Sequence, residues 1–359
     1  MRPGFWLGFV AALACSGCPT STDEPVTPIV HEDRMRAWVE FADGETLTEH
    51  LDFAEQHGVS LNVALIDGTH DWVYLRNLCR GAEERDLSLR LWPLLSEEDG
   101  YWANQQNADA FSEYVRVLAA WAGQDCPRLE GLVIDLEMPL DRALEMEGVF
   151  AGEGGVTDLV EFLVDGIDEA AFEAARIQYS TLVDDLHLEG FHVSASTLPM
   201  VLDDLEDGDE SIAHALWTPV RGIDWDVVSF QIYRSTFDSI YSAALSDPET
   251  AFTSGLITSY ADSAVIFYGD KAAIDLGTTG SGVGTEVGLD GPDELQADMA
   301  AALYAGIPIE QIHVYSLEGI MADDNPSAWL IDPLPHHPDV DAATEEWRAL
   351  MATMDALEN

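Results

Sequence analysis

Short apolar segments alternate with longer amphipathic segments along the chain from about residue 35. The short segments are rich in Val, Ile and Leu and end in polar or glycine-containing loops, which is typical of buried parallel strands. The longer segments carry apolar residues at helical spacing, and several stop just before a glycine, as helices often do. Strands are predicted at residues 36–41, 59–66, 87–94, 131–137, 191–197, 226–233, 272–277 and 312–317.

Eight consecutive strand and helix units predict a closed (β/α)8 barrel, the TIM barrel of the α/β class, formed by one domain over residues 35–359. A doubly wound open sheet is the alternative. It is disfavoured because no glycine-rich phosphate-binding fingerprint follows the first strand. The fourth unit is longer than the others, because residues 138–190 hold a glycine-containing loop and two predicted helices, at 157–166 and 168–190. This insertion is expected to shape one wall of the site.

Two further loops have unusual compositions. The glycine-rich stretch 277–288 has no Lys or Arg to bind phosphate, so it is interpreted as a lid over the barrel mouth. The acid-dense stretch 203–211 does not have the spacing of a calcium-binding EF-hand loop. It is therefore predicted to be a solvated loop.

The fourth predicted strand ends in two acids one residue apart, in the sequence EGLVIDLEMP at 130–139. Because side chains alternate along a strand, Asp135 and Glu137 share one face with Val133. In a barrel of this type the active site forms at the carboxyl ends of the strands, where inward residues can be polar. Two neighbouring carboxylates cannot both ionise cheaply, so one pKa should rise and provide a general acid. Helix capping or pairing with an arginine is the alternative role for such acids.

The same strand resembles the DGxDxDxE signature on the fourth strand of family 18 glycoside hydrolases, the chitinase-like group. DVVSFQIYRS (226–235) is similar to the sixth strand of that family, and IHVYSLEG (312–319) to the eighth. The resemblance implies that Glu137 is the general acid. It also implies that Asp135 orients the acetamido group of the substrate, whose carbonyl oxygen is the internal nucleophile of a retaining mechanism. Tyr233 would hydrogen-bond the same group and Gln231 would line the pocket, with inner-barrel packing as the alternative for both.

Three positions depart from the family pattern. Val133 replaces the middle Asp of the signature, so the acid relay beneath Asp135 is expected to be missing. The third strand, LSLRLWPLLSEEDG, lacks the Ser-x-Gly-Gly of the family, and Tyr315 stands in place of the Trp that floors the sugar site. These differences argue against specificity for chitin more than they argue against a barrel that acts on sugars.

Other side chains near predicted strand ends extend the candidate site. Glu318 is the second catalytic candidate, because it could form a conventional acid and nucleophile or base pair with Glu137. Asp275 and Glu40 could also face the pocket, although each acid alone could be a loop or capping residue. Trp102, after the third strand, offers a ring on which a sugar could stack. The expected substrate-binding set is Gln231, Tyr315, Asp275, Trp102 and Glu40.

Composition restricts the partners of the protein. The chain has 67 acidic and 15 basic residues and a net charge of −52, so its surface repels nucleic acid and anionic lipid headgroups. No Cys/His cluster has zinc-like spacing, so neither a metal nor a cofactor is expected. A metal-dependent phosphodiesterase barrel is disfavoured because no paired histidines follow the predicted strands. We expect a monomer that binds a carbohydrate.

The N-terminus predicts export. Residues 1–14 have the short apolar core of a signal peptide, and the small residues around Cys15 and Cys18 resemble the cleavage box of bacterial lipoproteins. Either cysteine could carry the lipid, with Cys15 slightly favoured, and 15–34 would be a linker that tethers the domain to the membrane of the cell envelope. An ordinary cleaved signal peptide is the alternative. Because an exported protein permits disulfides, Cys79 and Cys126 could form one, with two buried thiols as the alternative.

Two functional hypotheses follow from the sequence. The first is a surface-anchored glycoside hydrolase that acts on a polysaccharide or N-acetylated glycan, with Glu137 as general acid. The second is a non-catalytic barrel lipoprotein that binds glycans without cleaving them.

Overall fold

The computed structural model describes residues 35–69, 71–126, 129–151, 162, 164, 166–239, 241–247, 250–280, 288–331 and 333–354. The predicted signal peptide, lipidation site and linker lie outside these residues. So do most of the predicted helix at 157–166 and most of the predicted lid at 277–288.

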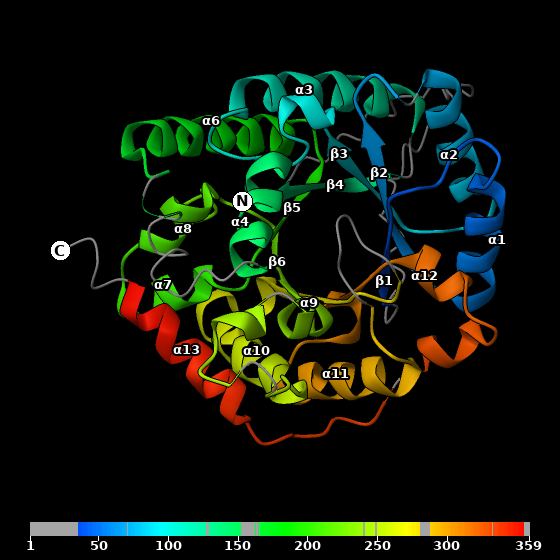
Figure 1. Ribbon diagram of the computed structural model, residues 1–359. Coiled ribbons are helices and arrows are strands. Elements are labelled where there is room, and N and C mark those ends of the chain that lie inside the picture. Colours follow the sequence, from blue (N-terminus) through cyan, green and yellow to red (C-terminus); the bar gives the residue numbers. More distant parts are fainter. Residues whose placement is uncertain are drawn as a thin grey trace, which may run out of the picture. The chain divides into compact units, whose positions relative to one another are not determined.

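The strands form a closed parallel barrel in which each strand pairs with the next and the last pairs with the first. The predicted (β/α)8 fold is therefore confirmed, and Figure 1 shows most of the helices around the outside of the strands. The strands are β1 (Arg36–Val39), β2 (Ser60–Ile66), β3 (Leu89–Leu94), β4 (Leu129–Leu136), β5 (His192–Thr197), β6 (Val227–Ile232), β7 (Ala272–Gly277) and β8 (Ile312–Tyr315).

The α-helices follow the strands along the chain. They are α1 (Leu47–His57), α2 (Trp72–Glu84), α3 (Ala108–Asp125), α4 (Leu140–Ala151), α6 (Glu169–Leu188), α7 (Val201–Asp207), α8 (Ser211–Leu216), α9 (Arg234–Ser239), α10 (Ser254–Tyr268), α11 (Pro292–Ala305), α12 (Leu317–Met321) and α13 (Ala342–Met354). Within the part of the chain that the structure describes, none of the helices combines the length and apolar character needed to cross a bilayer.

Alternation along each strand separates two cores. The outward residues of β4, Leu132, Ile134 and Leu136, belong to the large core between the strands and the helices. Val133 points the other way and packs in a smaller cluster inside the barrel with Trp38 and other aromatic residues. This separation leaves the inward positions near the carboxyl ends of the strands free for polar groups.

A cluster of ionic groups fills the amino-terminal end of the barrel. Arg36 and Arg90 both donate to the Glu130 carboxylate, with Arg36 Nη2 at 2.6 Å and Arg90 Nε at 2.9 Å. Burial lowers the pKa of Arg36 to about 10. Burial alone would raise the pKa of Glu130, but the two arginines outweigh it and hold that pKa well below its usual range. Arg36 and Glu130 are therefore ionised near neutral pH, and the cluster lies at the end of the barrel opposite Asp135 and Glu137.

Two loop predictions are wrong. Helix α4 occupies much of the segment predicted as a glycine-containing loop, because Leu140, Ala143 and Leu144 lie at helical spacing after Pro139. The acid-dense stretch is mostly helical rather than a solvated loop. Asp204, in α7, is buried and accepts hydrogen bonds from the amides of residues 212 and 213 at the start of α8, each at 2.8 Å. An acid at a helix start satisfies otherwise unpaired N–H groups, which explains its burial.

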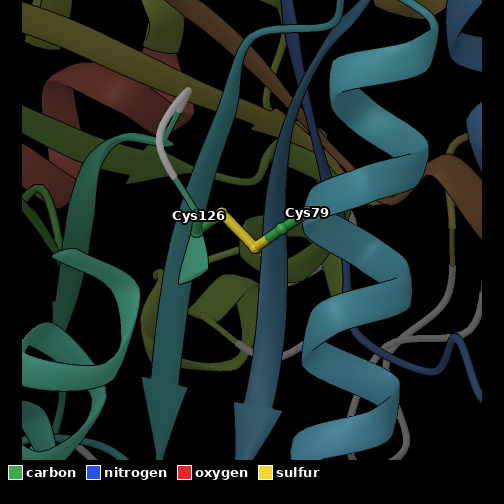
Figure 2. The surroundings of a disulfide bond; sticks show 2 residues. All are labelled: Cys79 and Cys126. Atoms are coloured by element: carbon green, nitrogen blue, oxygen red, sulfur yellow. A yellow bond between two sulfur atoms is a disulfide. The ribbon is translucent and has the colours of Figure 1, made fainter. Parts of the chain in front are cut away.

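A disulfide joins Cys79 of α2 to Cys126, which follows α3 (Figure 2). The bond links residues 47 positions apart and ties α2 to the segment that leads into β4. Both cysteines are buried in the large core.

Candidate active site

A pocket opens at the carboxyl ends of the strands, where the residues just before or after strand ends converge. It contains about 1060 Å³ of space, including the solvent at its open mouth. Its floor is polar and aromatic and consists of Trp38, Glu40, Trp92, Trp102, Asp135, Glu137, Gln231, Tyr233 and Tyr315. Three of these nine residues are acids, and none of the described lining residues is basic.

Asp135 at the end of β4 and Glu137 just after this strand meet at one amide group. The Nε2 atom of Gln231, on β6, donates to Asp135 Oδ1 at 2.8 Å and to Glu137 Oε1 at 2.9 Å. Glu137 follows the last residue of β4 but keeps the strand alternation, because its amide donates to the Ala103 carbonyl oxygen at 3.1 Å. The structure thus brings Asp135, Glu137 and Gln231 together inside the pocket, as the sequence predicts for residues on the inner face.

The environment of Asp135 favours its protonated form. Burial raises the pKa of this carboxyl well above its usual value, and the negative charges of Glu137, Asp275 and Glu40 raise it further. A hydrogen bond with Glu137 acts in the same direction. The pair therefore retains a proton at a pH where isolated carboxyl groups are ionised, which is the condition for general-acid chemistry.

A further acid lies inside the barrel. Asp275 of β7 is fully buried and accepts hydrogen bonds from Ser196 Oγ at 2.8 Å and Trp38 Nε1 at 3.2 Å. Ser196 also accepts from Gln231 Nε2 at 3.2 Å, so Asp275 is connected to the pocket acids through two side chains. The barrel thus places a carboxylate near Asp135 from β7, whereas the sequence comparison looks for one at Val133. Asp275 is not part of the pocket lining itself.

Glu40 forms a third acidic element with two tyrosines. Its carboxylate accepts from Tyr101 Oη at 2.7 Å and from Tyr315 Oη. Burial raises the pKa of Glu40 to about 7, although these two hydrogen bonds lower it. The ring of Tyr315 lies beside that of Tyr233, with 5.7 Å between the ring centroids. Burial, followed by the charges of Asp275, Asp135 and Glu137, raises the pKa of Tyr233, so its hydroxyl remains a hydrogen-bond donor.

Glu318 does not join the pocket lining. One of its carboxylate oxygens accepts from the backbone amides of Glu40 and Phe41, each at 2.9 Å. It therefore holds the chain just after β1, a supporting position behind Glu40. Trp102, by contrast, lines the pocket.

Several pocket residues were not found by sequence reasoning. Trp38 and Trp92 lie on the inner face and contact each other edge to face, with 4.8 Å between the ring centroids. Trp38 precedes Glu40 by two positions, so strand alternation was a signal that could have placed it on the same face. Helix α4 also lines the pocket, through Leu140, Ala143, Leu144 and Met146. The helical spacing of its apolar residues was the sequence signal that could have predicted this helix.

No group of three or more His, Cys, Asp or Glu side chains in the described part of the chain is arranged to hold a metal ion. The acids of the pocket are instead held by hydrogen bonds from Gln231, Tyr101 and Tyr315.

No protein-family model matches the chain, and no curated protein matches it by sequence. Solved structures do resemble it. The glycoside hydrolase domain of PgaB (BpsB) from Bordetella bronchiseptica superimposes with a TM-score of 0.52 at 10% sequence identity, covering 83% of this chain and 98% of that one. A D-allulose 3-epimerase from Methylomonas sp. gives a TM-score of 0.46 at 11% identity, covering 91% of this chain and 96% of its own. At these identities the likeness concerns the barrel fold.

Proposed function

We propose that this protein is a glycoside hydrolase that acts on a polysaccharide or N-acetylated glycan, with Glu137 as its general acid. The observation that carries the proposal is the pair of Asp135 and Glu137, bridged by Gln231 on the floor of an acidic, aromatic pocket. Aromatic rings and hydrogen-bonding side chains around carboxylates are suited to a neutral sugar, whereas the lack of basic groups in the described lining disfavours phosphorylated ligands. The barrel likeness to a protein named as a glycoside hydrolase domain also supports this assignment.

The arrangement of the two carboxyl groups suits a substrate-assisted reaction. Asp135 and Glu137 are neighbours on one strand face and share one amide donor, so they are too close for the water that an inverting pair holds between its carboxyl groups. The pair holds one proton. Glu137 gives that proton to the glycosidic oxygen as the bond to the sugar breaks, and the acetamido oxygen of the substrate attacks the anomeric carbon. The negative charge left on the pair then stabilises the positive charge of the cyclised acetamido group.

Other pocket residues would position the substrate. Tyr233 lies close enough to the acids for their charges to affect its pKa, and its hydroxyl would hydrogen-bond the acetamido group. Trp102, Tyr315 and Glu40 would bind the sugar ring through stacking and hydrogen bonds. Lipidation of Cys15 or Cys18 would hold the domain at the cell envelope, where extracellular glycans are accessible.

The proposal is tested by Glu137→Gln and Asp135→Asn, assayed on an aryl β-N-acetylhexosaminide and on soluble oligomers of N-acetylglucosamine. We expect each variant to lose at least about a hundredfold in kcat/KM, the usual size of a general-acid contribution. Glu189→Gln is the matched control, because Glu189 is exposed at the end of α6, away from the pocket. Wild-type activity in Glu137→Gln would remove that residue from the mechanism.

A non-catalytic glycan-binding barrel is the second candidate function, favoured by Val133 in place of an acid below Asp135. Binding of a glycan without release of reducing ends by the wild-type protein would support this function against the hydrolase.

A further inference from the structure

The pocket has an apolar wall next to its acidic floor. We use this name for Met138, Leu140, Leu144 and Met146, with Leu198 after β5 and Phe237 in α9. Leu144 is the most exposed of them, with 48% of its surface accessible, whereas Met138 and Phe237 are buried. The apolar wall thus runs from the pocket interior to solvent, and it begins one residue after Glu137.

The apolar wall offers few partners for sugar hydroxyl groups. In this part of the described lining, only Thr236 and Tyr241 carry a side-chain hydroxyl group, and the other side chains are hydrocarbon or thioether. A sugar hydroxyl that leaves water without a new hydrogen bond loses binding free energy. An apolar group placed there gains free energy from the same burial. The wall is therefore better suited to a hydrocarbon than to a second sugar.

We propose that the substrate carries an apolar aglycone beside the reacting sugar, and that the apolar wall binds this group. The proposal rests on the proposed hydrolase function, because Glu137 must protonate the oxygen that joins the sugar to its aglycone. The apolar group would lie beside the reacting sugar because the wall begins directly after Glu137, where the strand that carries the proposed catalytic acids ends. The substrate class is then an alkyl or aryl glycoside, such as a glycolipid, rather than a uniform polysaccharide.

The test measures binding to the Glu137→Gln protein, which prevents turnover of the ligands. Methyl, hexyl and phenyl N-acetyl-β-glucosaminides are compared by calorimetry below the micellar concentration. A buried CH₂ group is worth roughly a factor of four in Kd. We expect hexyl to bind at least about tenfold more tightly than methyl, and the phenyl compound shows whether aryl groups share this advantage.

Variants on the surface of the wall provide the control. Leu144→Asn should reduce the hexyl-to-methyl ratio at least about threefold without affecting folding, since Leu144 is half exposed. Leu188→Asn, at a leucine that is 88% exposed at the end of α6, should leave the ratio unchanged.

Equal binding of the methyl and hexyl compounds would overturn this inference and leave the hydrolase proposal standing. Hexan-1-ol binding as tightly as the hexyl glycoside would also overturn it, because the wall would then act independently of the sugar site. If no glycoside binds and the wild-type protein hydrolyses none, the proposed function itself fails, and this inference fails with it.

Discussion

The Nδ1 atom of His313 donates a hydrogen bond to Asp275 Oδ1 at 2.7 Å, and both side chains are buried inside the barrel. Burial lowers the pKa of His313, although the hydrogen bond and the charge of Asp275 raise it. The imidazole is therefore predominantly neutral at pH 7 and serves as a hydrogen-bond donor to the carboxylate. This contact orients the acid that Trp38 and Ser196 also contact.

Asp275→Asn is expected to destabilise the fold. An amide nitrogen cannot accept, so at least one of the three donors around this position loses its partner inside the barrel. Loss of a partner for a buried donor costs about 1–3 kcal/mol. Urea denaturation should show a decrease of this size in the free energy of unfolding, with Asp184→Asn, at an exposed position on α6, as the control. An unchanged midpoint would mean that Asp275 contributes nothing to the network.

Glu40 should make stability depend on pH. Its folded pKa of about 7 exceeds the ordinary value of 4.5, so the folded protein binds this proton more tightly than the unfolded chain does. The resulting stabilisation is fully present below pH 4.5 and is lost as the pH rises through 7. Glu40→Gln cannot ionise, so its stability relative to wild type should rise between pH 5 and pH 8, by up to ~3 kcal/mol.

The measurement is chemical denaturation of both proteins across this pH range. For Glu189→Gln, at an exposed site, the free energy of unfolding should depend on pH in the same way as it does for wild type. If the free energy of unfolding of Glu40→Gln also follows that of wild type across this pH range, Glu40 has an ordinary pKa.

Gln231→Leu should shift the pH profile of the proposed reaction. The amide of Gln231 donates to both pocket acids and so favours their ionised forms. Its removal should move both limbs of the pH profile of kcat/KM to higher pH and lower the maximum value of kcat/KM about a hundredfold. Gln124→Leu, on the exposed surface of α3, is the control. A profile with unchanged limbs and a reduced maximum would indicate a packing role for Gln231.

Loss of the disulfide should destabilise the protein by about 4 kcal/mol, the loop-closure value for cysteines 47 residues apart. The Cys79→Ser, Cys126→Ser double variant is compared with wild type by urea denaturation, with and without reductant. Reductant should lower the stability of wild type only. A wild-type protein that is insensitive to reductant under denaturing conditions would contradict the structural role of this bond.

Lipidation can be followed in producing cells with a fatty-acid label. We expect Cys15→Ala to abolish incorporation and Cys18→Ala to retain it. The opposite result would assign the anchor to Cys18. Label in neither wild type nor variant would leave an ordinary cleaved signal peptide as the explanation of the N-terminus.

Sequence periodicity was sufficient to predict the barrel and the inward direction of its acids. Strand alternation depends only on local geometry, so it placed Asp135 and Glu137 on the inner face. The same rule separates Val133 from Leu132 and Ile134, as the two cores of the structure confirm.

Contacts between distant strands could not be predicted in this way. Trp38 contacts Asp275 across 237 positions of sequence, and the pairing depends on the register around the whole closed sheet. Glu318 was misjudged as a pocket residue for a related reason: its carboxylate accepts hydrogen bonds from the backbone just after β1, and only ring closure brings β1 alongside β8. Helix α4 was missed because a glycine-containing stretch was given more weight than its apolar spacing.

The ion cluster of Arg36, Arg90 and Glu130 occupies the end of the barrel opposite the pocket. Under the proposed function, the substrate would enter the barrel at the carboxyl ends of the strands, where the pocket opens. Under the proposed function, products would leave through the same mouth by which the substrate enters, past the residues of α4 that line it.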